Sequence, residues 1–306
     1  MKKLAKKFGV GLLAGALTFL PAKRANSLEN IVNGNVIETI SEAPVKSGVN
    51  IKAWEYLGDR IGDFVGEAVT KDNGDFNLIL DNNSSNYLKL EISKSDSSYY
   101  QAERYVDLNK DILLDIVERH EVDVYDLDGN RTNIDFMKMF DMWCRDPALG
   151  GSTQRWEEQP KWYIWTDLAS QEQISMAEGI IKNDLVQFTN GFINNPYIEE
   201  GKQDDILSKA SYGSIIVYWR NYGGPGEHGE NLENNKIVAG TVSFNTIEPV
   251  KGTYIEELTQ VLGPRTETET RNFFDDKGYL ESGPQIGKVL YFRPIGSKTQ
   301  DEDPEP

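Results

Sequence analysis

The pattern of apolar residues changes once along the chain, and this change constrains the fold more than any other sequence feature. Between residues 30 and 118, apolar residues alternate in short runs separated by turn residues, with no helical period. Between residues 120 and 297, strand-like runs are interleaved with amphipathic, helix-like runs. A chain of 306 residues has room for about two domains, so we expect two domains of different class that meet near residue 120.

The segment 30–118 is predicted to be an all-β sandwich. Apolar residues alternate at positions 49, 51 and 53 and again at 76, 78 and 80, and Asp72-Asn73-Gly74 between these runs is typical of a tight hairpin turn. About seven short strands at this spacing favour two packed sheets. The pieces Gly34-Asn35-Val36, Gly48-Val49-Asn50-Ile51 and Asn73-Gly74-Asp75-Phe76 resemble the carboxypeptidase-regulatory-like (transthyretin-like) domain. This resemblance implies a non-catalytic accessory module.

The first 27 residues are predicted to be a signal peptide. Four lysines precede a short apolar run, and Ala25-Asn26-Ser27 is a small-x-small cleavage site. The apolar run is short for a membrane span, although an uncleaved interfacial anchor is the alternative. We therefore expect a secreted or periplasmic protein with no membrane span after cleavage.

Charge and cysteine content exclude several classes of protein. The chain has 32 basic and 49 acidic residues, a formal charge of −17, which argues against a nucleic-acid partner. One cysteine, Cys144, excludes an intrachain disulfide framework and cysteine-rich zinc modules, and we expect this thiol to be buried.

The segment 120–297 is predicted to be an α+β domain. The pattern predicts a buried helix at 134–143, strands at 161–166 and 214–219, an amphipathic helix at 175–192, and an edge strand at 237–244. The Gly- and Asn-rich segment 221–235, which contains His228, is predicted to be a surface loop. The tryptophans near position 160 are predicted to be core, and the acidic tail 298–306 is predicted to be disordered.

The helix predicted at 254–263 contains the most informative motif. It reads Glu256-Glu257-Leu258-Thr259-Gln260, whose spacing matches the His-Glu-x-x-His helix of zinc proteases. The general-base position keeps Glu257, but the two ligand positions hold Glu256 and Gln260. Gly263 matches the glycine of the extended metzincin motif, and Thr266 stands where its third histidine would be. Periodicity alone also allows a plain amphipathic helix with a solvated polar face.

These residues resemble an uncharacterised family of secreted bacterial proteins with a zincin-like (metzincin-like) organisation and Glu-Glu-x-x-Gln in the motif helix. Two later segments also match, Asn272-Phe273-Phe274-Asp275-Asp276 and Val289-Leu290-Tyr291-Phe292-Arg293-Pro294. The resemblance implies a mixed sheet with two main helices, in which the motif helix packs beneath a sheet with an edge strand over it.

Three functions remain open from the sequence. The chain has two histidines, His120 and His228, so a three-histidine zinc site is impossible. This favours a non-catalytic module that binds an extracellular or envelope peptide or protein, with no cofactor expected. The alternative is a divergent hydrolase in which Glu257 is the general base and Ca²⁺, Mg²⁺ or weakly held zinc is bound with help from Asp275, Asp276 or His228. A structure in which His228 and Glu257 lie in one pocket would favour this hydrolase hypothesis. The third possibility is a structural envelope protein that only docks partners.

Overall fold

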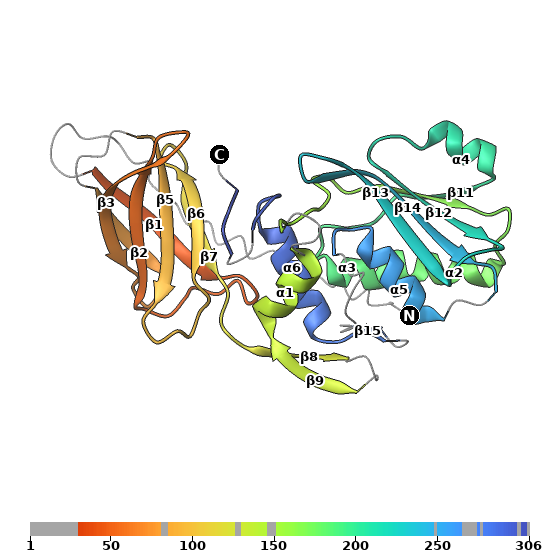
Figure 1. Cartoon of the computed structure of the whole chain (residues 1–306), viewed down its shortest axis with the longest axis horizontal. Helices are drawn as coiled ribbons and strands as arrows, with labels where there is room; N and C mark the ends of the chain where they lie inside the picture. Colours follow the sequence, from red (N-terminus) through yellow and green to blue (C-terminus); the bar gives the residue numbers. More distant parts are fainter. Residues whose placement is uncertain are drawn as a thin grey trace, which may run out of the picture.

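A computed structural model describes residues 30–80, 85–125, 130–145, 151–247, 250–264, 274–275, 278–298 and 301–304. The predicted signal peptide, Thr266 and Asp276 lie outside these residues. The described chain is rich in β-structure and contains several separate sheets (Figure 1). No helix in the described part is both long and apolar enough to span a bilayer.

The N-terminal part contains the seven predicted strands in two sheets. One sheet has the order β4-β1-β7 and the other the order β3-β2-β5-β6. Side chains such as Val36, Leu78, Ile51 and Leu90 come from both sheets and form one buried core between them, which confirms the alternation in the sequence. The strands are β1 (Asn30–Glu38), β2 (Val49–Tyr56), β3 (Ile61–Val69), β4 (Asp75–Leu80), β5 (Tyr87–Lys94), β6 (Ala102–Asp107) and β7 (Ile112–Ile116).

A hairpin and a buried helix follow the sandwich. Strands β8 (Glu121–Tyr125) and β9 (Arg131–Asp135) pair antiparallel, and α1 (Phe136–Cys144) begins directly after them. The side chain of Asp135 accepts a hydrogen bond from the backbone N–H of Lys138 and so caps the helix. Since six of its residues are buried, α1 confirms the prediction of a helix that is apolar almost all round.

The C-terminal part is built on a five-stranded sheet with the order β11-β10-β12-β14-β13. Four strands run parallel, and the outermost strand β13 runs antiparallel to β14. The strands are β10 (Lys161–Trp165), β11 (Ile198–Gly201), β12 (Ser214–Arg220), β13 (Gly226–Glu233) and β14 (Lys236–Asn245).

Two sequence expectations about this sheet were wrong. The segment expected to be a loop contains β13, and the edge position belongs to β13, whereas β14 lies inside the sheet. Strand β13 lacks β-branched residues, and its glycines and glutamates indicate a loop when taken alone. Pairing with β14 supplies its backbone hydrogen bonds, and edge strands tolerate polar residues because they stay partly solvated.

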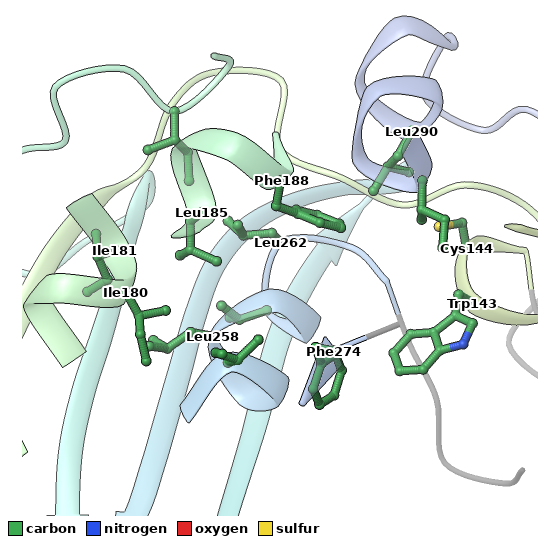
Figure 2. Packing of buried hydrophobic residues seen from close by; sticks show 14 of the residues in the cluster. Trp143, Cys144, Ile180, Ile181, Leu185, Phe188, Leu258, Leu262, Phe274 and Leu290 are labelled. Atoms are coloured by element: carbon green, nitrogen blue, oxygen red, sulfur yellow. The ribbon is translucent and has the colours of Figure 1, made fainter. Parts of the chain in front are cut away.

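Helices cover one face of this sheet (Figure 1). Helix α2 (Gln171–Gly179) continues through a π-helical turn (Ile180–Asp184) into α3 (Leu185–Phe188), and α5 (Lys251–Gln260) packs beside them. A capping box between Ser170 and Gln173 starts α2 earlier than the periodicity indicated. Figure 2 shows side chains of these helices, including Ile180, Phe188 and Leu258, meeting in one buried cluster.

The remaining elements extend the helix count beyond the two main helices expected. Helix α6 contacts both α1 and α3, so the C-terminal chain returns to the junction with the sandwich (Figure 1). Three of the four tryptophans predicted to be core, at positions 143, 156 and 162, are almost fully buried, whereas Trp165 at the end of β10 is only half-buried. These last elements are α4 (Gln203–Lys209), β15 (Phe274–Asp275), β16 (Gly278–Tyr279) and α6 (Ser282–Phe292).

The acidic tail is ordered where the structure describes it, so the prediction of disorder was wrong for residues 301–304. Asp301 is 1% exposed and forms ion pairs with Arg104, Arg145 and Arg293. Arg104 lies on β6 of the sandwich, Arg145 follows α1, and Arg293 follows α6. Local composition predicted a solvated tail, but three arginines from distant parts of the chain provide a buried site for its carboxylate.

Candidate functional site

Helix α5, which contains the Glu-Glu-x-x-Gln motif, is fixed at its C-terminal end by side chains from other elements. The indole N–H of Trp156 donates to the carbonyl of Val261 at 2.9 Å, and the hydroxyl of Tyr291 donates to the carbonyl of Leu262 at 2.9 Å. The chain then turns at Gly263, whose φ is 132°. A Cβ there would lie 2.2 Å from the carbonyl oxygen of Gln154, so glycine is required.

The apolar face of α5 holds the helix beneath the sheet. Tyr254, Ile255 and Leu258 are fully buried, and the Tyr254 hydroxyl accepts a hydrogen bond from the indole of Trp219 on β12 at 3.0 Å. Thr259 is also buried, and its hydroxyl is hydrogen-bonded to the hydroxyl of Tyr279. These contacts determine which side of α5 faces β13.

The centre of the candidate site is a contact between α5 and the edge strand. The Nδ1 atom of His228 on β13 lies 2.9 Å from Oε2 of Glu257 on α5, and both side chains are largely buried. Gly226, two residues before His228, makes this approach possible. A Cβ at Gly226 would lie 2.6 Å from Cγ of Glu257, so the strand and the helix could not come this close with a larger residue.

Two further carboxylates surround the imidazole. Oε1 of Glu230 lies 3.8 Å from Nε2 of His228, and the Glu230 side chain is 6% exposed. Burial raises the pKa of Glu256, the neighbouring carboxylate of Glu257 raises it further, and His228 opposes the rise. The site therefore places three carboxyl groups around one largely buried imidazole.

The structure unites some of the predicted site residues. Glu257 and His228 are in direct contact, and Glu256 is close enough to interact electrostatically with both. Gln260 is buried one turn further along α5. Thr266 lies outside the described residues, as does Asp276, and of Asp275 only the backbone is described, in β15.

Glu230 was missed by the sequence analysis. It stands two residues after His228, and on a strand this spacing places both side chains on the same face. The signal was present in the sequence, but it could be recognised only if the segment was known to be a strand.

The other histidine, His120, lies outside the candidate site and takes part in packing between elements. Nε2 of His120 lies 3.0 Å from the side-chain oxygen of Gln285 on α6, and the His120 ring stacks on Phe136 with centroids 4.8 Å apart. His120 therefore contributes to the packing between the hairpin region and α6.

Carboxylates and an imidazole are suitable ligands for a metal ion, but their arrangement also matters. Among the residues that the structure describes, no three histidine, cysteine, aspartate or glutamate side chains are placed to hold one ion. In the geometry described, Nδ1 of His228 faces Glu257. The arrangement favours two kinds of chemistry, recognition of a positively charged group or transfer of a proton between Glu257 and His228.

Comparison with known protein families finds no family model that matches this chain, and comparison with curated proteins finds no significant match.

Proposed function

We propose that this protein is exported and that its C-terminal domain binds an extended peptide by strand addition along the outer edge of β13. The observation that carries this proposal is the position of β13, which is the outermost strand of its sheet and also supplies His228 and Glu230 to the site. Within the described residues no strand pairs with its outer edge. A peptide there would gain backbone hydrogen bonds from β13 and side-chain contacts from the site.

The arrangement also supports a zincin-like fold without a zinc-ligand set. The resemblance requires the motif helix to pack beneath a sheet with an edge strand over it, and α5 packs against β14 and the edge strand β13. The two positions that would provide imidazoles hold Glu256 and Gln260, and a glutamine amide is a poor zinc ligand. Binding without zinc catalysis is therefore the better-supported function.

The test is a screen of a random peptide library against the purified protein, followed by affinity measurements on the best peptide. Peptides with N-methyl groups on alternate residues provide a matched control. One methylation register removes the N–H donors that face β13, and the other removes those that face solvent. We expect one register to abolish binding and the other to preserve it. Failure to select any peptide, or equal binding of both registers, would refute strand addition.

A second candidate function has one specific observation in its favour. The 2.9 Å contact between His228 and Glu257 brings an imidazole and a carboxylate into one site, and Glu257 could act there as the general base of a divergent hydrolase. Metal analysis and a peptide-library digest of the wild type, the Glu257→Ala variant and a Glu227→Gln control would separate the two. Stoichiometric metal and cleavage that depends on Glu257 would establish the hydrolase. Their absence would support binding alone.

A further inference from the structure

A second candidate site is a cavity whose lining contains no residue of β13. It has a volume of about 700 Å³ and lies where the sandwich, α1 and the C-terminal segment meet. Pockets of this size at junctions between structural units are common places for small ligands. The side chains that matter for its chemistry are Tyr100, Arg119, Met137, Lys138, Asp141 and Glu302.

Two cations in the cavity wall, Arg119 and Lys138, form no ion pair with any carboxylate that the structure describes. Arg119 donates through Nε to the carbonyl of Tyr99 at 3.2 Å, and its guanidinium lies 4.8 Å from the centre of the Tyr100 ring. Neither Arg119 nor Lys138 forms an ion pair within the described part of the chain. They can bind a carboxylate of a ligand.

Some carboxylates in the cavity wall already have partners among the described residues, and others do not. Asp135 accepts a hydrogen bond from the backbone N–H of Lys138 and also interacts with the Tyr100 hydroxyl. Asp301 is shared by three arginines, and Glu103 pairs with Lys89 at 2.7 Å. Glu302 forms no side-chain ion pair among the described residues. Asp141 has Arg145 as its partner, yet burial raises the pKa of Asp141 in spite of it. An additional cation beside Asp141 and Glu302 would be stabilised.

The remaining wall is apolar and adaptable. Met137 and the ring of Tyr100 are both less than 10% exposed, and Met142 packs partly buried against the core. Methionine side chains adjust to apolar groups of different shape because they are unbranched and polarisable. The wall can therefore accept an apolar group between the charged positions.

From these features we infer that the cavity binds a small zwitterion, namely a free amino acid or a short peptide with an apolar side chain. Arg119 and Lys138 bind its carboxylate, Asp141 and Glu302 bind its ammonium group, and Met137 contacts its side chain. Because Glu302 belongs to the C-terminal segment, the site is complete only when this segment is docked. The inference is independent of peptide binding at β13, since the two sites share no residue.

The experiment is calorimetric titration of the full protein with leucine, phenylalanine and their dipeptides. N-acetylleucine, which lacks the cation, and leucinamide, which lacks the anion, are matched ligands. We expect saturable binding of the zwitterions and at least about tenfold weaker binding of both blocked forms, because each loses a charge-assisted contact.

Variants identify the cavity as the site of binding. Lys138 is exposed, so Lys138→Ala should fold normally and weaken binding about tenfold. Lys110→Ala, which removes an exposed lysine of the sandwich outside the cavity, should leave binding unchanged. Absence of binding to every zwitterion at millimolar concentration would overturn the proposal. Equal binding of N-acetylleucine and leucine, or undiminished binding by Lys138→Ala, would also overturn it.

Discussion

Replacing Asp301 with asparagine removes a carboxylate that three buried arginines share. Oδ1 of Asp301 lies 2.6 Å from Nε of Arg293 and 3.3 Å from Nη2 of Arg145, and Oδ2 lies 2.9 Å from Nη2 of Arg104. The arginines are at most 4% exposed, so water cannot replace the lost charge. The variant leaves positive charges from three parts of the chain concentrated in one desolvated place.

The loss of stability depends on which carboxylates still pair with the arginines in the variant. Removing one partner of a buried ion pair costs about 3–5 kcal/mol. Arg104 and Arg293 keep a second carboxylate, Asp115, so we place the cost of Asp301→Asn near the lower bound, about 3 kcal/mol. For a cooperative folding unit of about 150–250 residues, a loss of about 3 kcal/mol in the free energy of unfolding lowers Tm by about 6–12 °C.

Urea denaturation followed by circular dichroism and tryptophan fluorescence measures this loss. Glu302→Gln is the control, because Glu302 is the neighbouring residue and is not part of the arginine cluster. It should change stability by less than about 0.5 kcal/mol. The pKa of Asp301 is held far below its usual range by Arg104, Arg293 and Arg145, although burial opposes this.

The pH dependence gives an independent check. A depressed pKa means that the stabilisation by Asp301 is fully present above the unfolded pKa of about 3.9 and is lost as the pH falls through the folded pKa. The gap between wild type and Asp301→Asn should therefore persist at pH 5 and shrink below about pH 4. If Asp301→Asn is as stable as Glu302→Gln at neutral pH, the reasoning is wrong.

Two further predictions concern the site on α5. Gly226→Ala should destabilise the protein by about 1–3 kcal/mol and separate His228 from Glu257, because the new Cβ would lie 2.6 Å from Cγ of Glu257. An unchanged Tm and an unchanged NMR titration of His228 would contradict this. Glu256→Gln should raise Tm at pH 7, because burial and the Glu257 carboxylate raise the pKa of Glu256, so its ionised form costs stability above that pKa. The advantage should vanish below about pH 4, where Glu256 is protonated even in the unfolded chain, and Tm measured against pH tests this.

Several elements were predictable because their signals are local. The alternation at residues 49–53 and 76–80 predicts two strands that each bury one face. The structure contains both, as β2 and β4 of the sandwich. The helix α1 and the motif helix α5 also overlap the segments that apolar periodicity predicted, although α5 (Lys251–Gln260) begins and ends three residues before the predicted range 254–263. Each of these elements buries a face that its own residues define, so the pattern survives in the sequence.

The candidate site was only partly predictable, because the contacts that bring its residues together are not local in the sequence. Glu257 was identified from a motif within one helix, and His228 was noted as one of two histidines. Their contact depends on the pairing of β13 with β14 and on the packing of α5 against β13. Glu230 joins the site only because β13 is a strand, and its own neighbours in the sequence indicate a loop.

Local patterns of residues are enough to predict the change from strands to mixed structure near residue 120 and the helix around the Glu-Glu-x-x-Gln motif. The residue count is enough to exclude a three-histidine zinc site. The edge position of β13, the contact between His228 and Glu257, and the burial of Asp301 become visible only in the folded chain. The physical reason is the range of the interactions. Burial of one face leaves a periodic trace in neighbouring residues, whereas a strand pairing or a buried ion pair joins residues far apart and leaves none.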